Sequence, residues 1–329
     1  MTVLVTGGAG YIGSHTVRAL RATGADVVVL DSLEHGHVEA VLDAPLEVGD
    51  IADVELVTDL VARYGVDSVV HFAGYKAAGE SMEVPERYFD NNVARTARLL
   101  ETLQTCGVAQ VVFSSSCSVY GTPSSLPVDE SHPTGPESPY AESKLLVERM
   151  LHWYDACHGV RSVSLRYFNA AGASPDARIG EDSPRPLNLV PLAMLAALGK
   201  IPKLSVYGTD YPTADGTCVR DYIHVDDLAD AHVRALDHLA RGGDTYALNV
   251  GTGKGSSVLE VVEGAKRVSG VDFAVETVPR RPGDPAAVWA DNTRVHDVLG
   301  WTATHDLDQI LESAWAWHSS HPDGYATAG

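Results

Sequence analysis

The segment from Gly7 to Gly13 constrains the fold of this chain more than any other part of its sequence. An apolar, β-branched run precedes it and an amphipathic stretch follows it, so a strand, a tight turn and a helix are expected in succession. Glycines at positions 7, 10 and 13 allow, in turn, a tight bend, close approach of a diphosphate to the backbone, and close packing of helix on strand. The first N–H groups of the helix would bind that diphosphate. An ordinary glycine-rich turn is the alternative.

The identity of the dinucleotide is suggested by Asp31, which ends the second predicted strand. A carboxylate about twenty residues beyond the glycines accepts hydrogen bonds from ribose hydroxyls and repels a 2′-phosphate, so the sequence favours NAD over NADP. A helix N-cap or a turn is the other common role of such an aspartate. Asp50, in a similar position after residues 47–49, is expected near the adenine edge.

Short β-branched runs alternate with helical stretches through the first half of the chain. This alternation predicts an α/β fold with a doubly wound parallel sheet of the Rossmann type, whose ligands bind beyond the carboxyl ends of the strands. Strands are expected at residues 3–5, 27–30, 69–72, 111–113 and 163–165, and helices at 11–22, 54–64, 94–106 and 140–158.

The composition of the sequence changes after Ala173: Pro and Gly become frequent, and the predicted loops contain His, Trp and Arg. We therefore expect an NAD-binding domain over residues 1–173 and a smaller α/β substrate lobe over 174–329. Some segments of the second part are expected to return to the first sheet, around residues 219–225 or 246–250.

Charge and composition limit the partners of the chain. Its 24 basic and 44 acidic residues give a net charge of −20, which disfavours nucleic acid and anionic membranes. No signal peptide precedes the first strand, and no apolar run reaches the roughly 18 residues of a membrane helix. The four cysteines lack the spacing of a metal site or a redox pair, so no metal and a cytoplasmic location are expected.

Tyr140 and Lys144 form a Tyr-x-x-x-Lys pair near the start of a predicted helix. Four residues make about one helical turn, so both side chains lie on one face, where a lysine ammonium favours the tyrosine phenolate. Tyr140 would then act as a general base. Ser114, Ser115 and Ser116 follow a predicted strand and can bind the reacting oxygen, although capping and turn formation explain such serines as well.

These motifs together resemble the extended short-chain dehydrogenase/reductases, and further segments resemble the UDP-glucose 4-epimerase family among them. The resemblance spans nearly the whole chain, and its second half is the more specific part. The segments are residues 6–15, 71–76, 91–93, 114–116, 119–121, 166–172, 188–189, 207–211, 216–225, 248–253 and 281–284.

The resemblance implies an isomerase that interconverts UDP-galactose and UDP-glucose with a retained NAD. A C4 hydride passes to NAD and back while a 4-keto intermediate rotates, Tyr140 moves the 4-hydroxyl proton, Ser116 binds the reacting oxygen and Lys144 positions the nicotinamide ribose. The implied cofactor-binding residues are Gly7, Gly10, Tyr11, Ile12, Gly13, Asp31, Asp50, Ile51, Phe72, Ala73, Gly74, Lys76, Asn91, Ser114, Tyr140, Lys144 and Phe168. The implied substrate-binding residues are Ser116, Tyr140, Asn169, Asn188, Leu189, Ser205, Val206, Tyr207, Arg220, Arg281, Asp284 and Val288.

Two positions depart from the family pattern. Ser32 stands where the family often has Asn or Asp, so its contact with adenosine is open. Val288 stands where some members carry Tyr, which narrows the sugar pocket. The smaller side chain predicts that UDP-GlcNAc and UDP-GalNAc are also accepted, unless a neighbouring side chain fills the space.

One implied substrate residue has a second explanation. Arg220 could instead form an ordinary surface ion pair, because such pairs are common and weak.

Three rival functions share parts of this pattern. A sugar-nucleotide 4,6-dehydratase needs a general acid and base beside the strand-end hydroxyl, whereas residues 116–119 contain no carboxylate. A UDP-xylose or uronate epimerase is closer in chemistry. A non-catalytic NAD sensor would not need Tyr140, Lys144 and Ser116. The resemblance also implies a homodimer formed through residues 92–106 and 143–157, whose apolar spacing core packing explains equally well.

Overall fold

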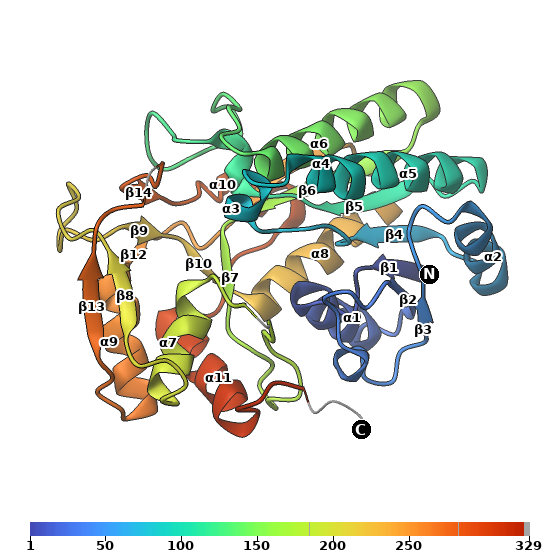
Figure 1. Ribbon diagram of the computed structural model, residues 1–329. Coiled ribbons are helices and arrows are strands. Elements are labelled where there is room, and N and C mark those ends of the chain that lie inside the picture. The colour runs from blue at the N-terminus through green and yellow to red at the C-terminus, as the bar shows by residue number, and fades with distance from the viewer. Residues whose placement is uncertain (184, 282, 326–329) are drawn as a thin grey trace.

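The computed structural model describes residues 1–183, 185–281 and 283–325, so Pro282, in one of the segments that carry the resemblance, lies outside the described residues. Its main feature is a seven-stranded sheet in the order β11-β6-β5-β4-β1-β2-β3, in which every neighbouring pair is parallel (Figure 1). The strands are β1 (Thr2–Thr6), β2 (Asp26–Asp31), β3 (Leu46–Val48), β4 (Ser68–His71), β5 (Gln110–Ser114), β6 (Arg161–Tyr167) and β11 (Tyr246–Val250).

Helices cover both faces of this sheet, which confirms the predicted doubly wound α/β fold. On one face, α1 (Tyr11–Ala22), α8 (Val225–Ala240) and α10 (Thr293–Leu299) bury leucine and valine side chains against the strands. On the other face lie α2 (Val54–Tyr64), α5 (Arg95–Thr105) and α6 (Pro139–His158). The central strands are buried on both sides, as their unbroken apolar runs require.

The order of the strands reverses at β1, which lies between β2 and β4. A reversal of this kind opens a crevice at the carboxyl ends of the strands, because the connecting helices leave toward opposite faces. The glycine turn leaves β1 at this crevice and the loop 72–77 leaves β4 beside it. The predicted site residues of the first half therefore surround one edge of the sheet.

A second body packs beside the sheet and contains its own apolar core (Figure 1). Its helices are α7 (Leu189–Ala197), α9 (Val258–Ser269) and α11 (Leu307–Ser320), and its strands β8 (Leu204–Tyr207) and β13 (Val275–Val278) pair in parallel. Short strands join the two bodies: β10 (Tyr222–His224) pairs with β7 (Asn169–Ala171), and β9 (Val219–Arg220) lies between β12 (Ser256–Ser257) and β14 (Ala287–Val288). The chain thus returns to the main sheet at β11, and residues 219–225 stay outside it.

The remaining elements are short. They are η1 (Val38–Val41), α3 (Ala78–Ser81), α4 (Pro85–Tyr88), η2 (Phe89–Ala94) and η3 (Cys117–Tyr120). The element η2 is a π-helical turn between α4 and α5, whereas the predicted helix began only at residue 94, so the helical conformation of residues 89–93 was not predicted. Single π turns inside helices occur frequently at functional sites, and this one carries two adjacent asparagines. No helix within the described ranges is long and apolar enough to span a bilayer.

Candidate active site

The glycine turn has the steric form that a dinucleotide needs. Gly7 has a φ of +72°, and a Cβ on it would lie 2.6 Å from the backbone nitrogen of Ala73. A Cβ on Gly13 would lie 2.2 Å from the carbonyl oxygen of Gly7. On Gly10, a Cβ would meet only the Gly7 carbonyl oxygen, at 3.3 Å, so this side of the turn is open to a ligand. Close packing therefore requires two of the glycines, and the third leaves room for a diphosphate.

The N-terminus of α1 behind this turn is suited to an anion. Gly10 caps the helix without a side-chain hydrogen bond, and the first turn contains no acidic residue. The first helical bond runs from the Ser14 N–H to the Gly10 carbonyl, at 2.9 Å. The backbone N–H groups of Tyr11, Ile12 and Gly13 are thus left for a ligand, with the positive end of the helix dipole behind them.

Asp31 and Asp50 both follow strands of the sheet, and both organise their own loops. The Asp31 carboxylate is 8% exposed and accepts hydrogen bonds from the backbone N–H groups of Ala9 (2.9 Å) and Leu33 (2.8 Å). It therefore organises the turn, and each carboxylate oxygen retains capacity for a further hydrogen bond. Asp50 accepts from Ala52 at 2.8 Å and forms an ion pair with Arg95.

The loop after β4 is held by Asn92, a residue that the sequence analysis did not select. Its amide accepts a hydrogen bond from the Tyr75 N–H (2.8 Å) and donates to the Tyr75 carbonyl (3.0 Å) and to Ser143 Oγ (3.0 Å). Asn91, the predicted cofactor residue, donates to Asn92 Oδ1 at 3.1 Å. Asn92 is 3% exposed and fixes Gly74 beside helix α6. A buried amide within an otherwise helical segment is the sequence signal that could have marked it.

Lys144 points inward from α6 toward the carboxyl end of β5. Its ammonium donates to the Ser114 carbonyl at 2.9 Å and lies 4.9 Å from the centroid of the Phe113 ring. Burial lowers the pKa of Lys144 to about 8, because the charged form is poorly solvated there. Through the ranges that the structure describes, no carboxylate oxygen lies within 4.0 Å of this ammonium. A buried cation that lies beside the loop after β4 and has no carboxylate partner among the described residues fits a role toward a ligand.

Tyr140 lies one turn before this lysine and is 9% exposed. Burial raises the pKa of Tyr140 above its usual value, and the neighbouring Tyr167 adds to the rise, whereas a hydrogen bond with Ser116 opposes it. The Lys144 ammonium lies 6.0 Å from the Tyr140 ring centroid and is engaged by a carbonyl. In the protein without a ligand, desolvation therefore outweighs the charge of Lys144 at this phenol, and the role of Tyr140 as a general base stays a prediction that also depends on the positive charge of a bound nicotinamide.

The three strand-end serines have different surroundings. Ser116 is 8% exposed, lies next to Tyr140, and accepts hydrogen bonds from the N–H (3.2 Å) and hydroxyl (2.9 Å) of Ser118. Ser115 donates to a Glu148 carboxylate oxygen at 2.6 Å, and Ser114 shares a 2.7 Å hydrogen bond with Tyr167. Ser116 is thus the serine whose hydroxyl is directed to the tyrosine.

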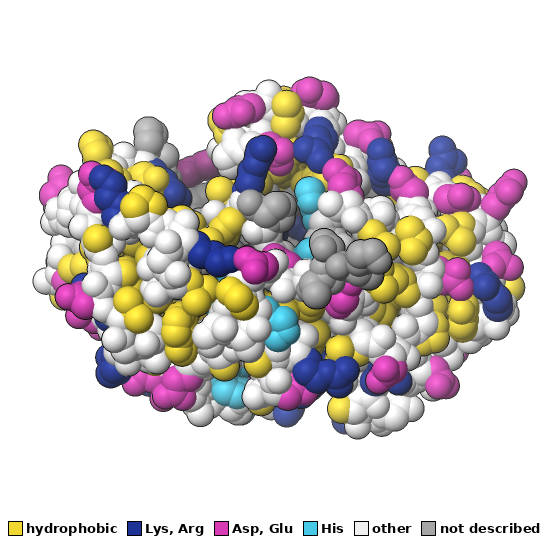
Figure 2. Space-filling view, turned by 60° about the horizontal axis from the view of Figure 1, so that its bottom comes forward, with side chains coloured by type: hydrophobic (Ala, Val, Ile, Leu, Met, Phe, Trp, Pro, Cys, Tyr) yellow, Lys and Arg dark blue, Asp and Glu magenta, His cyan; other side chains and the backbone are white. Residues whose placement is uncertain are grey.

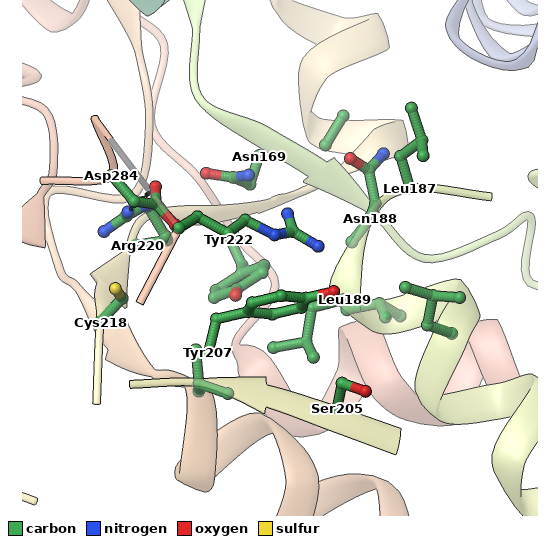
Figure 3. Close-up of a pocket in the computed structure, with 16 residues that line it drawn as sticks. Asn169, Leu187, Asn188, Leu189, Ser205, Tyr207, Cys218, Arg220, Tyr222 and Asp284 are labelled. Atoms are coloured by element: carbon green, nitrogen blue, oxygen red, sulfur yellow. Dashed lines mark hydrogen bonds and ion pairs between the residues drawn. The ribbon is translucent and has the colours of Figure 1, made fainter. Parts of the chain in front are cut away.

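A cavity lies in the second body, between α7, β8 and β9 (Figure 3). Two arginines of this cavity are held by neighbouring side chains. Arg220 forms a 2.6 Å ion pair with Asp284, and the guanidinium carbon of Arg281 lies 3.9 Å from the Tyr207 ring centroid. The aromatic face and the amides of Asn169 and Asn188 border the same space. The predicted substrate residues that line it are Asn169, Asn188, Leu189, Ser205, Tyr207, Arg220, Arg281 and Asp284.

The predicted substrate residues Val206 and Val288 do not line this cavity, and some predicted cofactor residues have apolar surroundings. The side chains of Val206 and Ile51 are buried in apolar cores. Phe168 and Val288 belong to one apolar cluster with Leu145. Phe72 packs its ring 4.7 Å from that of His232.

A buried carboxylate that the sequence analysis did not select organises the loops between the two sites. Asp221, fully buried, accepts hydrogen bonds from the N–H groups of Thr252 (2.9 Å), Gly253 (3.2 Å) and Ala290 (3.1 Å). It thereby joins β9, the loop after β11 and the segment after Val288. Asp221 lies in the segment 216–225 that carries the resemblance, but its partners are distant in sequence, so no local pattern predicts its hydrogen bonds.

The comparisons with known proteins agree with this geometry. Residues 3–251 match the family described as NAD dependent epimerase/dehydratase. A UDP-glucose 4-epimerase of Halalkalibacterium halodurans is 45% identical over 328 residues, covering 99% of this chain and 98% of that protein. The structure of UDP-glucose 4-epimerase from Brucella ovis with NAD has a TM-score of 0.94 at 44% identity, over 96% of this chain and 97% of that one.

A further solved structure carries both ligands. The UDP-glucose 4-epimerase of Bifidobacterium longum, in complex with NAD+ and UDP, has a TM-score of 0.93 at 40% identity and covers 99% of this chain and all of that one. Agreement of sequence and fold over the full length, rather than over the glycine turn alone, decides the assignment. The chain belongs to the NAD-dependent epimerase/dehydratase family and, within it, to the UDP-glucose 4-epimerases.

Proposed function

We propose that this protein interconverts UDP-galactose and UDP-glucose at C4 of the sugar. The observation that carries the proposal is the buried group of Tyr140, Ser116 and Lys144 at the sheet edge that also holds the glycine turn. The cavity with Arg220 and Arg281 supplies the donors for a diphosphate in the neighbouring body. The named relatives act as epimerases of UDP-glucose, which supports the same chemistry here.

Each residue of the catalytic group has one task in this proposal. Tyr140 accepts the 4-hydroxyl proton and later returns it, and Ser116 hydrogen-bonds the same oxygen. Lys144 holds the cofactor ribose and contributes its positive charge. NAD, when bound, supplies the hydride acceptor and the cationic ring that offset the effect of burial on Tyr140. The glycine turn and Asp31 fit that cofactor, because the turn is open at Gly10 and Asp31 is fixed by the turn itself.

Local donors are needed because the protein carries a net charge of −20. On the face in Figure 2, lysine and arginine side chains lie among acidic ones, so the field of the whole surface does not explain how a diphosphate binds. Arg220 is 15% exposed and presents a planar fork that matches phosphate oxygens. Asp284 fixes the orientation of that fork before the substrate arrives.

Arg220→Ala is expected to raise the KM for UDP-galactose by about 10- to 100-fold, with a smaller effect on kcat. Hydrogen bonds to charged groups contribute about 1.5–3 kcal/mol, and the unpaired Asp284 would then repel the diphosphate. Steady-state kinetics measure both constants. Arg234→Ala is the matched control, because Arg234 also pairs with an aspartate at 2.6 Å but lies on α8, outside the cavity. Equal KM values for the two variants would contradict the role of Arg220.

Val288 predicts acceptance of N-acetylated sugars. We expect the protein to convert UDP-GlcNAc to UDP-GalNAc, and Val288→Tyr to reduce that conversion at least tenfold while UDP-galactose turnover stays within about threefold. Product ratios by anion-exchange chromatography measure both reactions. Val288→Leu is the control, because it changes the side chain at this position without adding the bulk of Tyr. A wild-type protein that turns over UDP-galactose but not UDP-GlcNAc would contradict the prediction.

We also propose a homodimer formed through α5 and α6. Trp153 on α6 is 64% exposed, which is unusual for so large an apolar side chain and supports burial against a second copy. Trp153→Asp is expected to convert the dimer to a monomer in light scattering coupled to size-exclusion chromatography. His152→Asp, the adjacent position, controls for added charge. A wild-type monomer would contradict the proposal.

We likewise propose a cytoplasmic location. The four free cysteines support it, because free thiols are typical of a reducing compartment.

The reaction itself is tested with the protein as purified. Incubation with UDP-galactose, without added NAD, should yield UDP-glucose in a ¹H NMR time course. A 4,6-dehydratase would release a 4-keto-6-deoxy sugar, and an NAD sensor or an enzyme restricted to xylose or uronate would leave UDP-galactose unchanged. Either of these results would contradict the proposed function.

A further inference from the structure

The segment Gly180 to Asp182 of the substrate body reaches back to the nucleotide-binding body. Its central carboxylate, Glu181, is 6% exposed. One oxygen, Oε1, accepts hydrogen bonds from Lys76 Nζ at 3.2 Å and from Asn188 Nδ2 at 3.3 Å. Lys76 belongs to the loop after β4, beside the glycine turn, and Asn188 lines the diphosphate cavity. A single buried oxygen therefore joins the two ligand sites.

The backbone on either side of that carboxylate is held in place. The N–H of Gly180 donates to the Tyr325 hydroxyl at 3.1 Å, and the N–H of Tyr325 donates to Asp182 Oδ2 at 2.9 Å. His37 Nε2 lies 3.6 Å from the same Asp182 oxygen, and the His37 N–H donates to the Ala9 carbonyl in the glycine turn at 2.9 Å. These contacts anchor the backbone of the segment to the nucleotide turn, so the Glu181 side chain is the part that can adjust.

The charge of Glu181 acts on the hydroxyl of Tyr11. Burial raises the pKa of Tyr11 well above its usual range, and the Glu181 carboxylate is the next largest cause. That hydroxyl donates to the Gly172 carbonyl at 2.7 Å, and the backbone of Tyr11 begins α1, where the cofactor diphosphate is expected. Glu181 would repel a diphosphate bound there, and a cation that pairs with Glu181 reduces this repulsion. Lys76, at 63% side-chain exposure, is the cation that pairs with Glu181 there.

We propose that Glu181 is a positioning residue that couples the two binding sites. It holds Lys76 at the nucleotide turn and Asn188 in the diphosphate cavity, so a change on the cofactor side alters binding on the UDP side. Because Lys76 is exposed, its ion pair with Glu181 contributes little to stability by itself. Loss of Lys76 nevertheless leaves the buried Glu181 carboxylate without its cation, and the carboxylate then shifts. The shift is transmitted to Asn188. The identity of the two ligands rests on the proposed function; the coupling rests on the contacts of Glu181.

The decisive measurement is the Kd of UDP by isothermal titration calorimetry, with the protein as purified. Lys76→Met is expected to raise this Kd about 5- to 10-fold, although Lys76 does not line the cavity. Glu181→Gln is expected to raise it similarly and to speed the loss of NAD on repeated desalting. In the Glu181→Gln background, Lys76→Met should change the Kd less than twofold. Glu276→Gln is the control, because Glu276 pairs with Lys203 at 2.6 Å on the surface.

Two results would overturn the proposal. A UDP Kd of Lys76→Met within twofold of wild type would show that the cofactor site and the UDP site are independent. This variant should fold, because it changes an exposed side chain. Effects of Lys76→Met and Glu181→Gln that multiply in the double variant would assign Glu181 a purely structural role. Because UDP binding needs no turnover, failure of the epimerase reaction would leave this test valid.

Discussion

Tyr140→Phe is expected to lower kcat for UDP-galactose by about 10²- to 10⁴-fold, the range that general acid–base catalysis contributes. The change removes one oxygen from a buried ring and leaves the packing of α6 intact, since the ring itself is retained. KM should change little, because the diphosphate is bound in the cavity around Arg220. Steady-state kinetics with the NAD content of each preparation measured in parallel check this result.

Tyr154→Phe is the matched control for this substitution. Tyr154 lies on the same helix, packs at its edge against the apolar cluster of α5 and α6, and is remote from Ser116. We expect its kcat to stay within about twofold of wild type. If Tyr140→Phe retained wild-type kcat, Tyr140 would not be the group that moves the proton, and the water or side chain that replaces it would have to be sought around Ser116.

Gly13→Ala is expected to abolish cofactor retention and to destabilise the protein. The new Cβ would lie 2.2 Å from the Gly7 carbonyl oxygen and 2.8 Å from Gly8 Cα, so α1 must move away from the sheet. Overpacking of this kind costs about 3 kcal/mol, or about 4 °C in Tm for a chain of this length, before the loss of ligand stabilisation is added. Differential scanning calorimetry and the absorbance of released NAD measure the two effects.

Two further alanine substitutions separate steric damage from ligand loss. Gly79→Ala, in α3, meets no atom within 4 Å and should leave both Tm and NAD content unchanged. Gly10→Ala meets only the Gly7 carbonyl oxygen at 3.3 Å, so the fold should survive while the diphosphate site is blocked. A Gly13→Ala protein with wild-type Tm and a full complement of NAD would contradict the assigned role of the turn.

Local pattern was enough to predict the elements that form the nucleotide site. The expected helices 11–22 and 54–64 have the observed bounds of α1 and α2, because their apolar spacing and the glycines before α1 act within a few residues of each other. The Tyr-x-x-x-Lys spacing likewise predicted that Tyr140 and Lys144 share one face of a helix. The spacing could not predict how burial and nearby charges together set the pKa of Tyr140. Burial is the largest cause, and it raises that pKa.

Contacts between distant residues account for what the sequence left out. Glu181 meets Lys76 across 105 positions, and Asn92 meets Ser143 across 51. Asp221 collects its hydrogen bonds from loops 31 to 69 residues away. Lys76, Asn92 and Asp221 stand in segments that carry the family resemblance, but those segments do not show which distant side chains they meet. These contacts form only when the fold brings the loops together. The individual roles of the site residues stay predictions that the variants above test.

In the proposed reaction a hydride leaves C4 of the sugar and returns to the same carbon. UDP-galactose carrying deuterium at C4, incubated in ordinary water with the protein as purified, tests this step most directly. The UDP-glucose formed should keep its deuterium at C4, with no net accumulation of NADH. Loss of the deuterium to water during turnover would show that the C4 hydrogen leaves as a proton and would contradict hydride transfer.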